Sequence, residues 1–242
     1  MEVQKLDFVL VSLGLFVFVA YHTWLVIAIK RNPRHTVIGL NAESRSQWVF
    51  SLMADPLKNG VLVVQTLRNN MMASTLLATT AITLSSIIGV FVSSTSTVSN
   101  ASFKLVYGNK SEIMSSIKYF ALILCFLVAF LCNVQSIRYY AHVSFLATLP
   151  TSQGKKEAME YAARSLNRGS FFWSLGLRAF YLSFPLFLWI FGPIPMFGCS
   201  CLMSIVLYFL DTTNSFTRHL HCESFKHSDN NGMLPNVVMN DI

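Results

Sequence analysis

Long stretches without a charged side chain constrain this sequence more than any of its other features. The first stretch, Phe8–Ile29, holds 22 residues and contains no Asp, Glu, Lys or Arg. A helix of that length, at about 1.5 Å per residue, crosses the hydrocarbon core of a bilayer, which is about 30 Å thick. Its apolar core is too long for a cleaved signal peptide, and no A-x-A cleavage pattern follows it. We therefore expect an uncleaved helix that spans a membrane.

Four more apolar runs follow the first one. They are Met71–Val92, Tyr119–Ile137, Phe171–Ile190 and Met196–Leu210. The last run has only 15 residues after an expected tight turn at the sequence FGPIP, so it needs flanking residues, a thin bilayer or a re-entrant hairpin. Charged residues make up 12% of the chain, against about a quarter in soluble domains. The sequence predicts an all-α, polytopic integral membrane protein with five transmembrane helices.

The connecting segments differ in positive charge, and this difference predicts the orientation of the chain. Residues 30–70 contain six Lys and Arg, residues 138–170 contain five, and residues 93–118 contain three. Because cytosolic loops are enriched in Lys and Arg, we expect the first two segments in the cytosol and the third outside. Both N-x-[ST] sequons, at Asn100 and Asn109, lie in the outside segment as candidate glycosylation sites. The N-terminus is then outside and the C-terminus cytosolic, in an endomembrane or the plasma membrane.

Two of the expected helices extend well beyond the membrane. Asp55 can cap a helix and Pro56 can occupy its first position, and no helix breaker appears before residue 92. A helix over 56–92 measures about 55 Å, nearly twice the hydrocarbon thickness. The third span likewise continues until Pro150. We therefore expect long helical extensions on the cytosolic side.

Two shorter helices are expected beside these extensions. Asn41–Ala54 begins with Asn41 as its cap, and Ser152–Arg168 ends before Gly169. Their apolar stripes are too narrow to span, so they pack on the long helices as a membrane-proximal subdomain or lie in the headgroup layer. A dedicated partner groove is the alternative.

The chain then divides into six consecutive segments. They are an outside N-terminus with the first span (1–29), cytosolic helices leading into the second span (30–92), an outside loop (93–118), the third span with cytosolic helices (119–170), a hairpin of the fourth and fifth spans (171–213), and a polar cytosolic tail that we expect to be disordered (214–242).

Several stretches resemble one known family. The sequence DPLKNGVLVVQTLRNNMMASTLLATTAI, in which QTLRNNMMASTLL enters a span, resembles the widespread membrane family called domain of unknown function 599. RNPRHTVIGLNAESRSQWV, IRYYAHVSFLATLP and GSFFWSLGLRAFYLSFPLFLWIFGPIPM are also similar to that family, in its plant form. The resemblance covers about residues 5–215, with the pieces in the expected order. It implies a multi-pass membrane protein and supplies no assigned chemistry.

Five polar residues within or next to the spans are candidates for a functional site. These are His22, Arg138, His142, Arg178 and Asp211. We expect His22 to be neutral with one hydrogen bond, and a protonation switch is the alternative. Arg178 can snorkel to the cytosolic interface. A pair of Asp211 with Arg178 or Arg138 would hold helices together or line an anion or lipid-headgroup site.

Two other patterns have a structural and a functional interpretation. Small hydroxyl residues recur on one face of the second span, which favours close helix packing over a polar transport pathway; they are Thr75, Thr79, Thr83 and Ser86. Metal-ligand types also gather in the tail, at His219, His221, Cys222 and His227. A flexible tail lacks preformed geometry, so we expect no metal and no other cofactor.

No catalytic motif or phosphate-binding glycine loop is present, which favours a protein that is not an enzyme. The net charge of +7 lies between apolar runs, so it indicates anionic phospholipid rather than nucleic acid. We expect a non-enzymatic membrane component of unknown molecular activity that binds protein or lipid partners through its cytosolic helices, with a homo-oligomer also open. A small-solute or ion transporter or channel subunit is the first alternative, and a membrane-embedded lipid enzyme is the second.

Overall fold

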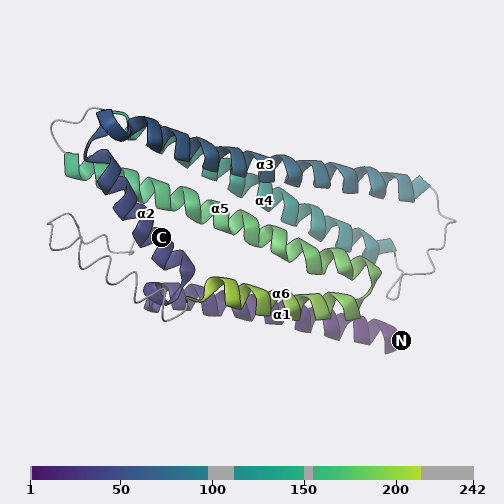
Figure 1. Ribbon diagram of the computed structural model, residues 1–242. Coiled ribbons are helices and arrows are strands. Elements are labelled where there is room, and N and C mark those ends of the chain that lie inside the picture. Colours follow the sequence, from purple (N-terminus) through teal and green to yellow (C-terminus); the bar gives the residue numbers. More distant parts are fainter. Residues whose placement is uncertain (1, 98–111, 150–154, 214–242) are drawn as a thin grey trace. The chain divides into compact units, whose positions relative to one another are not determined.

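Helices form nearly all of the structure, a computed structural model that describes residues 2–97, 112–149 and 155–213 (Figure 1). The helices are α1 (Glu2–Arg31), the short 3-10 helix η1 (Pro33–His35), α2 (Val37–Met53), α3 (Pro56–Thr97), α4 (Glu112–Leu146), α5 (Lys155–Phe191) and α6 (Pro193–Asp211). All except η1 and α2 are long and apolar enough to cross a membrane, which makes five candidate spans. The described residues contain no β-strand, only an isolated bridge between Thr36 and Thr212. The predicted all-α class with five transmembrane helices is confirmed.

Two helix starts show how local chemistry sets the boundaries. The Asp55 side chain accepts a hydrogen bond from the Lys58 amide at 3.3 Å, and Pro56 is the first residue of α3, as predicted. The prediction that a helix begins at Asn41 is wrong. The Thr36 hydroxyl accepts a hydrogen bond from the Gly39 amide at 3.2 Å, so α2 begins one turn earlier.

The predicted end of a helix before Gly169 is also wrong, because α5 runs without a break from Lys155 to Phe191. A Cβ atom on Gly169 would lie 3.0 Å from the Tyr139 Cβ and 3.1 Å from the Tyr140 Cε1. This glycine therefore permits close contact between α5 and α4, and it is not a helix terminator. Gly and Pro commonly serve packing roles in membrane helices, and Pro185 also lies inside α5.

The fifth apolar segment is longer in the structure than in the sequence analysis. Helix α6 begins at Pro193, and proline suits this position because the first amide of a helix has no partner within the helix. The turn expected at FGPIP therefore consists of Gly192 alone. Its 19 residues measure about 28 Å, close to the hydrocarbon thickness. Helix α4 begins at Glu112 and ends at Leu146, so it stops before Pro150 and contains Lys118.

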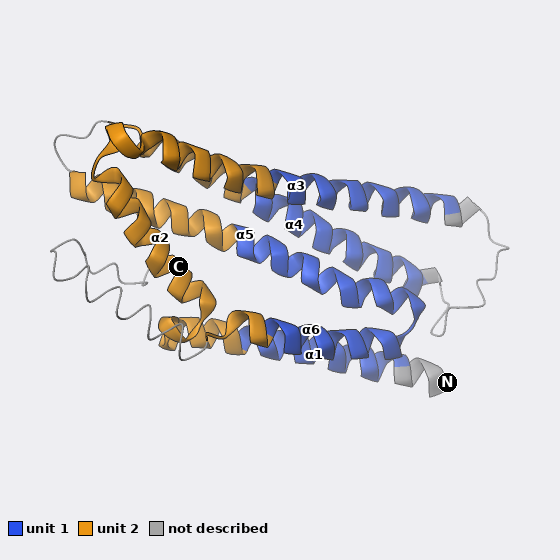
Figure 2. Cartoon of the chain, in the orientation of Figure 1, with its two compact units in different colours: residues 1–23, 75–134, 173–207 blue, residues 24–74, 135–172, 208–242 orange. Residues whose placement is uncertain are grey.

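The chain forms two compact units, and the long helices contribute to both (Figure 2). Unit 1 consists of residues 1–23, 75–134 and 173–207, and unit 2 consists of residues 24–74, 135–172 and 208–242. The core of unit 1 contains Val11, Ala81, Leu122, Phe126, Ala129, Leu186, Trp189 and Met196, from five helices.

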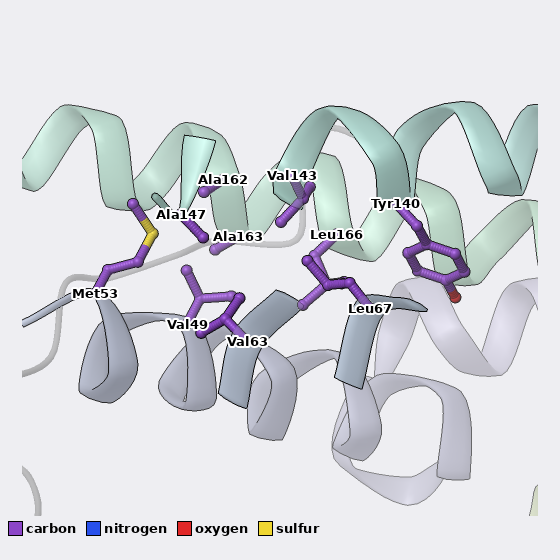
Figure 3. Packing of buried hydrophobic residues seen from close by; sticks show 10 residues of the cluster. All are labelled: Val49, Met53, Val63, Leu67, Tyr140, Val143, Ala147, Ala162, Ala163 and Leu166. Atoms are coloured by element: carbon purple, nitrogen blue, oxygen red, sulfur yellow. The ribbon is translucent and has the colours of Figure 1, made fainter. Parts of the chain in front are cut away.

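The core of unit 2 joins α2 to those parts of the long helices α3, α4 and α5 that belong to this unit (Figure 3). Its buried members are Val49, Met53, Val63, Leu67, Tyr140, Val143, Ala147, Ala162, Ala163 and Leu166, from α2, α3, α4 with the turn that follows it, and α5. The small side chains of α4 and α5 let these helices approach closely. Helix α2 therefore packs on the long helices, as the first interpretation of that segment expected.

Candidate functional site

Polar side chains buried between apolar helices are costly, so each group of them is a candidate site. Unit 2 holds two such groups and unit 1 holds two others, and each group is described within its own unit. In the described ranges, no three His, Cys, Asp or Glu side chains come together.

The first group, in unit 2, is a hydrogen-bonded set of Arg45 and Ser46 on α2 with Asn167 on α5. The Asn167 Nδ2 donates to the Ala42 carbonyl at 3.2 Å and to the Ser46 Oγ at 3.1 Å. Its Oδ1 accepts a hydrogen bond from the Arg45 Nε at 3.0 Å. The two donated bonds fix the orientation of the amide, so its oxygen is aimed at the guanidinium.

Arg45 is partly buried and has no acidic partner among the described residues. Burial lowers the pKa of its guanidinium, and the nearby Tyr140 side chain partly offsets that effect. An arginine remains protonated at neutral pH despite such a shift. Within the described part of the chain, neither of its Nη atoms has a hydrogen-bond partner. The result is an oriented cation whose terminal nitrogens can still bind an anion.

The second group in unit 2 connects three long helices through hydroxyls. The Ser136 Oγ on α4 donates to the Gly169 carbonyl of α5 at 2.8 Å, and the Ser74 Oγ on α3 donates to Ser136 over 3.5 Å. Both serines are fully buried. These bonds satisfy polar groups between helices, which is a structural role.

Unit 1 contains a buried pair of opposite charges. Asp7 on α1 and Lys118 on α4 are 3% and 4% exposed, and they interact electrostatically. The Lys118 Nζ lies 5.5 Å from the ring centroid of Trp189 on α5, which is within cation–π range. Asp7 directly precedes the apolar run Phe8–Ile29 and Lys118 directly precedes Tyr119–Ile137, so no local pattern in the sequence joins the two charges. Their shared position, at the ends predicted to lie outside, was the available signal.

Asn133 on α4 is another buried polar residue of unit 1. It is 0% exposed, and its Nδ2 donates to the Ala129 carbonyl at 2.8 Å. A Cβ atom on Gly176 would lie 2.6 Å from that nitrogen, so the glycine makes room for the amide. The Oδ1 has no hydrogen-bond partner among the described residues. This site therefore retains an acceptor inside a candidate span.

The structure describes all five predicted site residues. The His22 Nδ1 donates to the Phe18 carbonyl at 2.8 Å, and the neutral state of its ring stays a prediction. His142 is exposed and contacts the Tyr161 hydroxyl at 3.1 Å through its Nε2. Arg138 is exposed as well.

The expected pairing of Asp211 stays a prediction. Asp211 is buried and belongs to unit 2, whereas Arg178 is partly buried and belongs to unit 1. The candidate glycosylation sites Asn100 and Asn109 lie outside the described residues, as does Cys222 with its neighbouring histidines.

The hydroxyl stripe of the second span does not pack as predicted. Thr79, Thr83 and Ser86 are exposed, and each hydroxyl donates to a carbonyl of its own helix, at 3.0, 2.7 and 2.9 Å. These bonds satisfy the hydroxyl groups within α3 itself, so the hydroxyls need no partner on a second helix in an apolar environment.

The part of α3 that belongs to unit 2, residues 56–74, has one buried and one exposed face. Val63 and Leu67 lie in the core of unit 2, whereas Leu57 is 96% exposed and Val61 is 83% exposed. Arg68 is exposed on the same face as Leu57 and Val61, since spacings of four and seven residues place side chains on one side of a helix.

Comparison with known proteins gives one match. A family model described as "Protein of unknown function, DUF599" matches residues 9–216. No curated protein matches the chain. No solved structure matches it either. The narrower resemblance to plant members of the family stays a prediction.

Proposed function

Because the chain belongs to the DUF599 family of proteins of unknown function, whose description names no activity, we propose a function from the geometry of the helices. The protein is a non-enzymatic, multi-pass membrane component that binds a protein partner through the exposed face of α3 in unit 2. Unit 2 faces the cytosol, with the N-terminus of the chain outside and the C-terminus inside.

The distribution of charge supports this orientation. The described residues of unit 2 contain eleven basic residues (Lys and Arg) and five acidic residues (Asp and Glu). Those of unit 1 contain three basic and three acidic residues. Cytosolic segments of membrane proteins carry the excess of Lys and Arg. The anionic inner leaflet attracts such segments as well.

The exposed face of α3 is the observation on which the partner proposal depends. Helix α3 has 42 residues and measures about 63 Å, about twice the hydrocarbon thickness. The charge of Arg68 marks the end of the part that lipid can cover, so Leu57, Val61 and Leu62 lie beyond the hydrocarbon. Burying one such side chain stabilises a complex by about 1.5–3 kcal/mol, so a contiguous set of them favours a partner.

Site-specific photo-crosslinking tests this proposal. A photoreactive amino acid at Val61 should give a discrete protein adduct in native membranes, because its side chain is open to a partner. The matched control is Val90, which is 68% exposed on the same helix but inside the expected span, and should give lipid adducts. A Val61 probe that yields only lipid adducts, or none, would overturn the proposal.

A transporter or channel subunit is the second candidate, because Asp7 and Lys118 bury charges in helices that can span a membrane. Intramembrane charges often mark ion pathways. In this chain the two charges are opposite and interact, which favours a structural role, holding α1 to α4, over a role in transport.

A further inference from the structure

We propose that unit 2 binds a phosphate group at the guanidinium of Arg45, in a site assembled from α2, α4 and α5. This site is separate from the exposed face of α3 and does not require the protein partner proposed above. The ligand is a phosphate monoester or inorganic phosphate, which offers several anionic oxygens to one planar cation.

The guanidinium is oriented before any ligand arrives. Asn167 is held by the Ala42 carbonyl and the Ser46 hydroxyl, and it accepts the Arg45 Nε–H at 3.0 Å. That bond uses the inner edge of the guanidinium and leaves the two Nη groups for a second partner. Arginine binds phosphate with parallel hydrogen bonds, and an arginine held in place loses less entropy in doing so.

The contrast with Arg34 in η1 shows what Arg45 lacks. The Arg34 Nη2 lies 3.0 Å from the Glu43 Oε1 and its Nε lies 3.3 Å from the Glu43 Oε2, so that cation is neutralised within the chain. Arg45 has a neutral amide in the same role, although it is the more buried of the two side chains. A partly buried charge without an opposite charge is costly, and a bound anion removes that cost.

The depth of the site matches the phosphate level of a bilayer. Asn167 lies four residues before the apolar run that starts at Phe171, or about 6 Å along the helix. Tyr140, which neighbours Arg45, lies three residues after the run that ends at Ile137, or about 4.5 Å. The headgroup region extends about 5–8 Å beyond the hydrocarbon on each side. A lipid phosphate or a free phosphate at the membrane surface can therefore reach the site.

Ligand titration of the full-length protein in non-ionic detergent tests the assignment. The probes are dioctanoyl phosphatidic acid, with dioctanoyl phosphatidylcholine as comparator, and inorganic phosphate. We expect phosphatidic acid to bind at least about tenfold more tightly than phosphatidylcholine, because a monoester presents more anionic oxygens. Binding of the lipid alone identifies a headgroup site, and binding of inorganic phosphate with equal affinity identifies a free phosphate site.

Three variants separate this site from general attraction to positive charge. Arg45→Gln should weaken phosphate binding at least about tenfold. Arg45→Lys should retain only part of the wild-type affinity, because lysine lacks the paired, parallel N–H donors of the guanidinium. Asn167→Asp should also weaken binding, since it supplies the missing carboxylate, and it leaves the cation in place. Arg68→Gln removes an exposed cation of the same unit and should change the affinity less than about twofold.

Two outcomes would overturn the proposal. One is a wild-type protein that binds neither phosphate probe. The other is Arg45→Gln or Asn167→Asp protein that is folded by size-exclusion chromatography and binds phosphate as wild type does. Both results leave crosslinking at Val61 unchanged, so failure of this site is distinguishable from failure of the partner interface.

Discussion

Gly169 shows what a single missing side chain contributes to the packing of unit 2. Its Cα approaches Tyr139 and Tyr140 so closely that an added methyl group would lie 3.0 Å from one and 3.1 Å from the other. Neither tyrosine can yield easily, because Tyr140 is buried in the core and Tyr139 stacks on Phe172 with ring centroids 5.7 Å apart. The carbonyl of Gly169 also accepts the Ser136 hydroxyl.

We therefore expect Gly169→Ala to destabilise the protein by about 1–3 kcal/mol, the usual cost of overpacking a core. Thermal unfolding in detergent, followed by fluorescence-detected size-exclusion chromatography, measures the change in midpoint. The control is Gly198→Ala on α6, where an added Cβ meets nothing within 4 Å. That variant should be equal to wild type or slightly more stable, since Ala is the better helix former. Equal midpoints for both variants would contradict the packing role.

At the scale of elements, Asp7, Lys118 and Trp189 hold α1, α4 and α5 together in unit 1. Removing one member of a buried pair leaves an uncompensated charge and costs about 3–5 kcal/mol. We expect Lys118→Met to lower the unfolding midpoint strongly. Asp7→Asn in the same chain should restore much of the loss, because it removes the stranded charge.

A double-mutant cycle measures this coupling directly. The same variants reconstituted in proteoliposomes distinguish the structural role from transport. A structural pair predicts that the stable double variant and the wild type have the same ion flux. The structural role would be contradicted if the stability losses of the two single variants simply add in the double variant. An ion flux present only in the wild type would also contradict it and would favour a transporter.

The elements also show which parts of the fold the sequence can predict. Apolar runs predict the number of spans, because each helix must satisfy its own backbone in lipid. Helix ends are harder, since Gly169 looks like a stop until the neighbouring tyrosines are known. The sites are harder still: Arg45 and Asn167 are separated by 122 residues, and no local pattern joins them. Asp7 and Lys118 likewise meet only after the helices pack.

At the scale of the whole molecule, the membrane orientation decides which compartment each proposed site can sample. An Arg45 site and an α3 face on the cytosolic side can meet cytosolic phosphates and proteins, whereas the segment with Asn100 and Asn109 would be open to glycosylation. The positive charge of unit 2 motivates this arrangement. Sealed microsomes, which keep their cytosolic face outward, provide the test.

We expect Lys155→Cys, introduced with Cys222→Ser, to react with a membrane-impermeant maleimide in sealed microsomes. Lys155 is the exposed first residue of α5, and among the described residues its Nζ donates to the Ala54 carbonyl, so the substitution removes this surface hydrogen bond. Lys104→Cys in the same background should react only after detergent is added, and Asn100→Gln with Asn109→Gln should abolish any shift on glycosidase treatment. The reverse labelling pattern would place unit 2 outside the cytosol. It would then remove the cytosolic partner and any cytosolic phosphate as ligands, because neither could reach its site.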